Sequence, residues 1–223
     1  TRQGGFLVPH IGYSSTQGTR YNQDFFLTLG QSQDLTLSID SRDQAGSGGG
    51  LEYRYAPSQG TYGALHTEFF ENRLTETNRF LVQYLHRQSL GERINLMMDT
   101  RYVNQERYFS ELSDIPSERG LQNIVSTGSI TYRGDESFAY LLARYTQDLT
   151  RPENNRPLQR LPEIGWRLMA HRIGPFYFSE EVVHTRFVQD KRSWQRTDLY
   201  PTLFWPIRVA SAVTLTPWGG YRP

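Results

Sequence analysis

The 223-residue sequence contains no cysteine, which excludes disulfide bonds and thiolate metal sites. It also has little net charge, because 24 Lys and Arg residues nearly balance 23 Asp and Glu residues. The formal charge of +1 gives no overall attraction to nucleic acid or to an anionic membrane surface. Its apolar runs are only a few residues long, whereas a transmembrane helix needs about 20 apolar residues. These shortages favour a soluble β protein as the first interpretation.

The aromatic content points the other way. Aromatic residues make up 13% of the chain, including 14 tyrosines. Tyr and Trp accumulate where one end of a ring lies in an apolar phase and the other end is wet. A transmembrane β-barrel also has a low average hydropathy, because half of its strand residues face a polar lumen. The low hydropathy therefore does not exclude a membrane protein.

The stretch GERINLMMDTRYVNQERYF, residues 91–109, alternates between a mostly apolar and a mostly polar set of positions. A period of two indicates a β-strand, because successive side chains point to opposite faces. The same alternation recurs along the chain, and no segment shows a helical period over three turns. We predict about 13 strands near residues 5–14, 20–29, 34–43, 50–56, 61–73, 78–88, 92–109, 122–133, 137–149, 163–173, 176–189, 197–207 and 209–217.

The connections between these strands differ in length on the two sides. Those that follow every second strand are short (GQSQ, APSQG, QSLGE, RGDE, RIGP and WPIR), and most of the others are longer, including QAGSGG, SELSDIPSERG, TRPENNRPLQRLP and QDKRSWQR. Short turns on one side and long loops on the other are typical of outer-membrane barrels. The sequence therefore predicts an all-β fold, an antiparallel up-and-down transmembrane β-barrel.

This fold assigns a face to each alternating residue. We expect lipid to cover Ile94, Leu96, Leu141, Trp166 and Leu168, and Trp205 to anchor at the membrane interface. We expect water in the lumen to reach the charged set Arg93, Asp99, Arg101, Arg107, Arg144 and Arg167. For any single member of this set, pairing across strands is a stronger expectation than contact with a ligand. Loops 110–120 and 150–162 are predicted to lie exposed on the cell exterior.

The predicted strand number indicates part of a larger barrel. Bacterial single-chain barrels have an even number of strands, whereas about 13 are predicted here. The sequence starts without Met and shows no signal peptide, and it ends on a proline that cannot donate to a closing ladder. We expect residues 1–223 to be a single segment, the first half of an outer-membrane barrel domain.

Several motifs resemble one known family. The stretch GFLVPHIGYSSTQG, residues 5–18, is similar to the start of the barrel domain of the lipopolysaccharide-assembly outer-membrane protein family, LptD or OstA. The segments RYNQDFF, LEYRY, LQRLPEI, IGPFYF and RTDLYPTLFWP resemble later strands of that family, in the right order. One departure is Asp24, which stands where family members often carry a second proline.

The resemblance implies a location, partners and a mode of action. It implies a barrel near the ~26-strand end of the range, in the bacterial outer membrane, that is not an enzyme and has no cofactor. The implied partners are lipopolysaccharide, a lipoprotein plug in the lumen, and periplasmic bridge proteins that contact an upstream domain. The lipid bilayer surrounds it, and no nucleic acid is involved. Substrate would leave sideways between the first and last strands.

Pro9 interrupts the first predicted strand. Proline removes a ladder hydrogen bond, so within a sheet it marks an edge or a bulge. A bulge without a role is one interpretation, and a seam that opens is the other. Together with the resemblance, Pro9 favours one lip of a lateral gate formed by Phe6, Leu7, Val8, Pro9, Gly12 and Tyr13.

Other sites receive little support. The five histidines lack metal-ligand spacing, so no metal site is predicted. His10 and Ser14 share a face but lie about 13 Å apart by strand rise, which argues against a catalytic dyad. GSGGG at residues 46–50 lacks the lysine of a phosphate loop and is predicted to be a flexible loop tip. The functional alternatives are a generic porin-like barrel and a soluble β-sheet carbohydrate-binding module.

Overall fold

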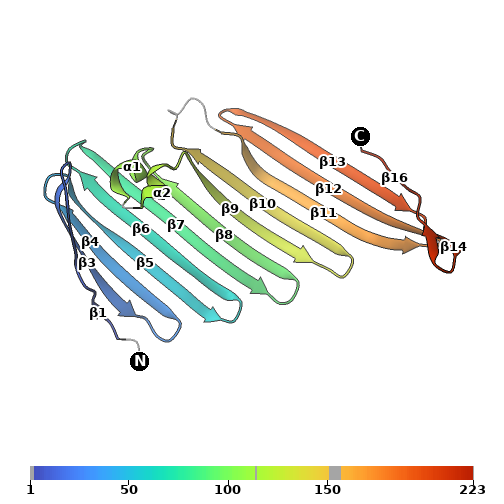
Figure 1. The fold of residues 1–223 in the computed structure, drawn as a ribbon, viewed down its shortest axis with the longest axis horizontal. Coiled ribbons are helices and arrows are strands. Elements are labelled where there is room, and N and C mark those ends of the chain that lie inside the picture. Colours follow the sequence, from blue (N-terminus) through green and yellow to red (C-terminus); the bar gives the residue numbers. More distant parts are fainter. Residues whose placement is uncertain (1–2, 114, 151–156, 223) are drawn as a thin grey trace. The chain divides into compact units, whose positions relative to one another are not determined.

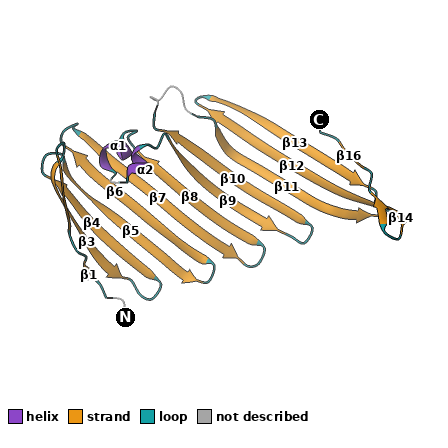
Figure 2. Ribbon diagram, viewed as in Figure 1, coloured by secondary structure: helices purple, strands orange, loops and turns teal. Residues whose placement is uncertain are grey.

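The computed structural model describes residues 3–113, 115–150 and 157–222. Nearly all of its regular structure is strand (Figure 2). The two helices are short, α1 at Tyr108–Leu112 and α2 at Pro116–Arg119. The strands are β1 Gly5–Phe6, β2 His10–Ser14, β3 Gly18–Thr28, β4 Gln33–Arg42, β5 Gly46–Ser58, β6 Thr61–Asn72, β7 Thr77–Leu90, β8 Ile94–Val103, β9 Asn123–Arg133, β10 Ser137–Asp148, β11 Gln159–Ile173, β12 Phe176–Gln189, β13 Arg192–Phe204, β14 Ile207–Ala210, β15 Val213–Leu215 and β16 Trp218–Gly220.

Fourteen strands form one sheet in which chain neighbours are sheet neighbours (Figure 1). The order runs from β1 through β3 to β13 and ends at β16, while β2 pairs with β3. The registered pairs are antiparallel. The predicted all-β meander is confirmed. The order is open, since β1 and β16 do not pair, and this is consistent with part of a barrel. None of the described helices has the length and apolar character needed to cross a membrane.

The chain divides into two compact units, each described by itself. Unit 1 comprises residues 1–88, 97–126 and 146–156, and unit 2 comprises residues 89–96, 127–145 and 157–223.

Register assigns the side chains of unit 1 to two faces. Leu37 lies opposite Leu51, which in turn lies opposite Thr67 of β6. Asp40 lies opposite Gly48, and both belong to the other parity. We call the side with Leu37 and Leu51 the apolar face and the side with Asp40 the polar face. The alternation in the sequence therefore places the charged residues of β3–β7, except Glu71, together on one side of the sheet.

Unit 2 shows the same division. Trp166 of β11 lies opposite Ala139 and Val182, which gives this unit an apolar face. Arg167 lies opposite Phe138 and Glu181 on its polar face. The opposite placement of Trp166 and Arg167 agrees with the sequence prediction.

Several predicted connections are shorter than expected. QAGSGG shrinks to the turn 43–45, and QDKRSWQR shrinks to Asp190–Lys191 because β13 begins at Arg192. Among the described connections of that side, only 104–122 is long, and the loop around 150–162 lies partly outside the described residues. The length asymmetry therefore rests on fewer loops than the sequence suggested.

Two local predictions are wrong. GSGGG is no loop tip, because these residues begin β5 and pair with both β4 and β6. A Cβ at Gly48 would lie 2.1 Å from the Phe69 carbonyl oxygen, so the close approach of β6 requires glycine there. The predicted strand 92–109 ends at Val103, and Arg107 precedes α1. Arg107 thus lies on no strand, which removes the basis for its predicted strand face.

Candidate functional site

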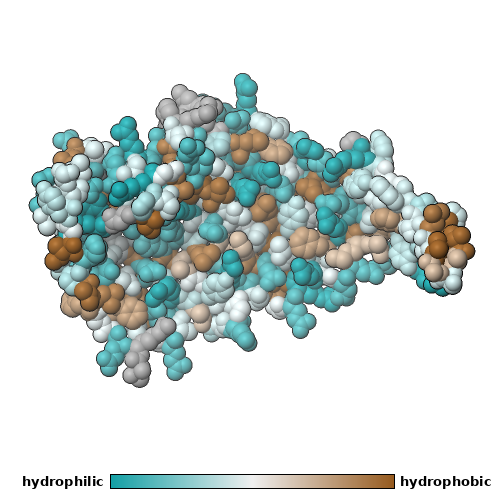
Figure 3. All heavy atoms as spheres, viewed as in Figure 1, coloured by the Kyte–Doolittle hydropathy of each residue, from teal (hydrophilic) through white to brown (hydrophobic). Residues whose placement is uncertain are grey.

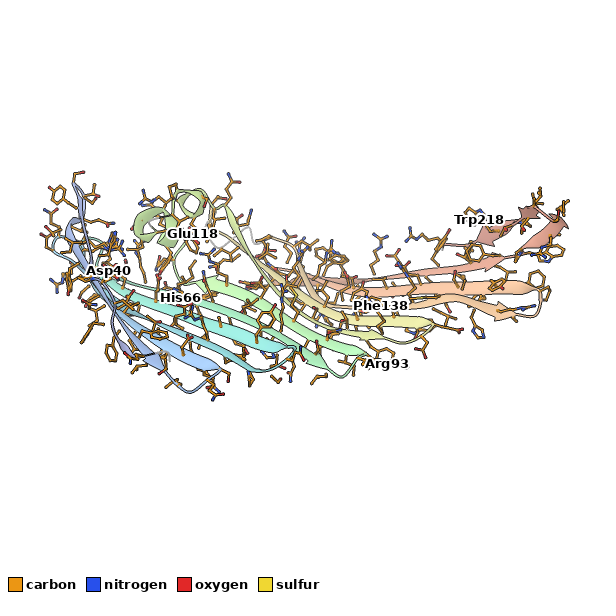
Figure 4. The ribbon with its side chains drawn as sticks, turned by 60° about the horizontal axis from the view of Figure 1, so that its bottom comes forward. Asp40, His66, Arg93, Glu118, Phe138 and Trp218 are labelled. Atoms are coloured by element: carbon orange, nitrogen blue, oxygen red, sulfur yellow. The ribbon has the colours of Figure 1, made fainter. Side chains whose placement is uncertain are left out.

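A roof formed by the described residues of 104–122, which are 104–113 and 115–122, covers part of the polar face of unit 1. Its helices α1 and α2 lie over the sheet, with Glu118 above the face that carries Asp40 and His66 (Figure 4). Three roof side chains, Tyr108, Phe109 and Leu112, are buried. They form one apolar cluster with sheet and loop residues Ala45, Phe70, Leu81, Val103, Ile124 and Leu149. The prediction that 110–120 is an exposed loop is therefore wrong for Leu112, although Ile115, Pro116, Ser117, Arg119 and Gly120 are exposed.

Arg101 of β8 joins the sheet to the roof. Its Nη2 donates to Glu118 Oε1 at 2.5 Å, and its guanidinium lies 4.2 Å from the ring centroid of Phe109. With the Gln83 amide oxygen turned toward it, Arg101 also donates to Gln83 at 2.6 and 2.9 Å. These contacts combine an ion pair with a cation–π interaction, each favoured by partial removal from water.

Arg79 of β7 forms a second connection. Its side chain is 5% exposed and its Nη2 lies 2.5 Å from Glu111 Oε2 of α1. Its Nε and Nη1 have no hydrogen-bond partner among the described residues. A buried guanidinium with a single carboxylate partner depends strongly on that partner.

Arg42 is the most buried cation of the site, with 4% of its side chain exposed. It donates to Asp40 at 2.8 Å, to Gln17 Oε1 at 2.6 Å and to the Leu112 carbonyl oxygen of the roof at 3.4 Å. Asp40 also accepts from Arg20 at 2.9 Å. Two arginines thus share one carboxylate, and the pairing satisfies the buried charge without a ligand.

Tyr108 fixes the centre of the roof. Its hydroxyl donates to Glu68 of β6, which also contacts His66 Nε2 at 2.9 Å. Burial, reinforced by the Glu68 carboxylate, raises the pKa of the Tyr108 phenol. The phenol therefore stays protonated and remains a donor at neutral pH.

A cavity of about 320 Å³ lies between the roof and the sheet. Its lining carries three guanidinium groups (Arg20, Arg42 and Arg101) and three carboxylates (Asp40, Glu68 and Glu118), with Gly49 and Gly50 along its floor. Such a lining suits a polar or zwitterionic group better than an apolar one. No group of three or more metal-binding side chains occurs in the described parts of the chain.

The predicted lumen-facing residues lie in separate places. In unit 1, Arg101 lines the cavity and Asp99 is exposed. In unit 2, Arg167 donates to Glu181 at 2.8 Å and Arg93 donates to Asp135 at 3.1 Å, while the exposed Arg144 lies opposite Arg160. The structure does not gather these residues into one site.

Apart from Arg101, sequence reasoning missed the charged residues that line the cavity. Arg20, Asp40 and Arg42 belong to the polar parity of β3 and β4, so alternation could have placed them on the sheet. No local pattern indicated that Tyr108 would reach Glu68, 40 residues away.

The predicted gate segment lies along β3. Gly5 and Phe6 pair with Phe26 and Phe25, and His10 pairs with Asn22. Between these pairs, three residues (7–9) on the first strand lie opposite two residues (23 and 24) on β3. The extra residue defines a β-bulge at residues 7–9. Leu7 still donates to the Asp24 carbonyl oxygen at 2.9 Å.

Exposure is the other feature of this segment. Val8 and Tyr13 are 92% and 79% exposed. Within the described residues, β1 and β2 pair only with β3. Pro9 therefore lies in a bulge of a strand that has one neighbour within the described residues, and its role in a gate stays a prediction.

Comparison with known proteins identifies the family. A family model described as LptD, LPS transport system D, matches residues 77–222, which is more than half of the chain. The chain belongs to the LptD family. The match runs from β7 past β16 and includes the whole roof. The resemblance noted at residues 5–18 extends the likeness to the segment before the match.

The LptD relatives are distant but cover most of the chain. An LPS-assembly protein LptD of Cupriavidus necator is 27% identical over 83% of this chain and 23% of its own length. One of Vibrio vulnificus is 26% identical over 97% of this chain, and one of Chromohalobacter salexigens is 25% identical over 99%. These two matches cover 28% and 30% of the relatives' lengths. The chain therefore spans about a quarter of the LptD relatives that it matches.

Proposed function

We propose that this chain is part of the β-barrel of an outer-membrane protein that assembles lipopolysaccharide. The family match over residues 77–222 carries the proposal. The strands support it, since β3–β13 have 10–15 residues each, and a tilted strand needs about 9–11 residues to span a bilayer. In this proposal residues 1–223 form one segment, the first half of the barrel domain.

The two faces of the sheet support a position in the membrane. Aromatic rings lie on the apolar face toward the short-turn ends of the strands, with Tyr53 and Tyr55 stacked at 5.5 Å in unit 1 and Phe176 and Trp205 5.6 Å apart in unit 2. Rings of this kind accumulate at membrane interfaces. We place lipid against the apolar face and the water-filled lumen against the polar face.

The polar face is the proposed path and docking surface. Arg93, Asp99, Arg101, Arg144 and Arg167 contribute to the wall of the lumen, where phosphates and sugars of lipopolysaccharide or a lipoprotein plug would make polar contacts. Most of the arginines already have a carboxylate partner, so their first role is to keep the wall neutral. Periplasmic bridge proteins would deliver the substrate to an upstream domain. The proposal assigns no catalytic step.

The segment Phe6, Leu7, Val8, Pro9, Gly12 and Tyr13 is proposed as one lip of a lateral gate. Its support is Pro9, which has no backbone N–H to donate to a ladder, in a segment whose side away from β3 has no strand partner within the described residues. Each missing bond is worth about 0.5–1.5 kcal/mol net. The other lip would be the last strand of the full-length barrel.

The test uses the full-length protein in cells depleted of their own copy. Arrival of newly made lipopolysaccharide at the cell surface is measured with and without a cysteine crosslink between Leu7 and the last strand. We expect the uncrosslinked protein to restore delivery and the crosslink to block it until a reductant is added. Delivery through the crosslinked protein refutes the gate. Ion conductance with no delivery by either form refutes the assembly function and favours a porin.

A further inference from the structure

The connection after β13 is not the short turn that WPIR suggested. Trp205 donates through its backbone N–H to the Pro217 carbonyl oxygen at 2.9 Å. Phe204 lies opposite Trp218, and Ile207 lies opposite Leu215, so two residues lie between the two pairs on each strand. β13 and β14 therefore pair with β16 and β15 as one continuous hairpin.

This hairpin extends past the sheet. The neighbouring strand β12 begins at Phe176, whose ring packs on Trp205. β12 therefore provides no strand neighbour for the residues that follow Trp205. Residues 206–216, which we call the protruding hairpin, are thus unsupported on that side. Four residues from Ile207 to Ala210 correspond to about 13 Å of strand. By contrast, Gly174 and Pro175 alone join β11 to β12 on the same side.

The protruding hairpin has one apolar side. Phe178 lies opposite Leu203 and Val182 opposite Leu199, so Leu203 and Trp205 continue the apolar face of unit 2. Ile207 follows Trp205 at the same parity and faces Leu215, whose side Val213 shares on β15. The register shifts between Arg208 and Ala210, which leaves Val209 in a bulge. Arg208 and Thr214 face each other on the other side.

Nothing in the described chain covers this apolar side. Val209, Val213 and Leu215 are 66%, 55% and 58% exposed. Figure 3 shows hydrophobic side chains gathered over this hairpin, at the right-hand end of the view. Exposed apolar patches of this kind mark a surface that another phase or molecule covers.

The charges around the hairpin indicate the occupant. From Leu199 to the end of the sequence there is no acidic residue, whereas Arg208 and Arg222 are basic. Trp205 and Tyr221 add rings that are 45% and 70% exposed. Apolar side chains together with aromatic rings and arginines, without carboxylates, are the composition of segments that lie in the headgroup region of a bilayer.

We propose that the protruding hairpin is an interfacial anchor, whose apolar side lies on the phospholipids of the membrane leaflet at the short-turn side. The apolar face of β13 would meet the hydrocarbon, Trp205 would mark the interface, and Ile207, Val213 and Leu215 would enter the headgroup layer. Arg208 and Arg222 attract anionic headgroups. The inference rests on the proposed membrane position of the barrel, because the anchor continues its lipid-facing side.

The test uses the full-length protein, one copy per nanodisc of phosphatidylethanolamine and phosphatidylglycerol. An environment-sensitive fluorophore is attached at Val213→Cys or, as the matched control on the other side, at Thr214→Cys. A third label at Leu141→Cys reports on the apolar face of β10. Quenching is measured with phospholipids that carry a nitroxide on the headgroup or deep in the acyl chain.

We expect the headgroup nitroxide to quench the Val213 label severalfold more than the Thr214 label, and phosphatidylcholine discs or high salt to reduce this difference. Equal, water-like signals at both positions overturn the anchor. A protected Val213 label that no lipid nitroxide quenches also overturns it and indicates a protein partner. In both cases, quenching of the Leu141 label by the acyl-chain nitroxide keeps the proposed barrel position intact, whereas its absence refutes that position.

Discussion

Removing the ring of Phe109 should detach the roof from the sheet without unfolding the strands. Phe109 is 2% exposed, lies edge-on to Tyr108 with centroids 5.2 Å apart, and lies under the Arg101 guanidinium at 4.2 Å. Replacing a buried Phe by Ala costs about 3–5 kcal/mol, and about 1.4 kcal/mol corresponds to a tenfold change in an equilibrium. Because the loss falls on local docking, the undocked population should rise by roughly two to three orders of magnitude.

Hydrogen exchange of the full-length Phe109→Ala protein in nanodiscs measures this population. We expect amides of residues 104–122 to exchange much faster and those of β5 and β6 to keep their protection. Phe69→Ala is the matched control, since Phe69 is 51% exposed and lies on the apolar face. Unchanged exchange in the roof, or equal acceleration from both variants, would show that the buried ring does not hold the roof.

Three further predictions concern the sheet. Gly48→Ala should lower the denaturant midpoint of the full-length barrel, because its Cβ would lie 2.1 Å from the Phe69 carbonyl oxygen. Gly128→Ala should not lower it, because the space around a Cβ at Gly128 is open. Equal midpoints for the two variants would contradict the close approach at Gly48. Pro9→Ala restores a backbone N–H beside the bulge, so surface delivery of lipopolysaccharide should slow while the midpoint stays constant; unaltered delivery argues against a role in the gate. A water-soluble maleimide should modify Arg167→Cys and spare Trp166→Cys in nanodiscs, and equal modification would contradict the assignment of faces.

The alternation of side chains was sufficient to predict the sheet. β12 has the bounds predicted from sequence, Phe176–Gln189, and β6 and β10 differ by one residue at one end. A strand with one apolar and one polar face has a single acceptable register, because a shift by one residue would exchange the faces. Periodicity therefore contains most of the information that specifies β3–β13.

The roof could not be predicted in the same way. Residues 104–122 are polar and contain Pro116, so they match the pattern of an exposed loop. Their burial depends on three apolar side chains and on partners far along the chain, such as Glu68 and Arg42. The glycines of β5 show the same limit, since only the neighbouring β6 explains why Gly48 belongs in a strand.

The distribution of charge between roof and sheet gives the roof a second property. In two connections the roof supplies the acid and the sheet supplies the base: Glu111 pairs with Arg79, and Glu118 pairs with Arg101. Arg42 and Arg20 have Asp40, a partner within the sheet itself. Displacement of the roof therefore leaves these latter pairs intact but uncovers two guanidinium groups that have lost their carboxylates. The closed site is electrically balanced, whereas the open site presents positive charge, so an anionic group would bind the open state more tightly and shift the equilibrium toward it.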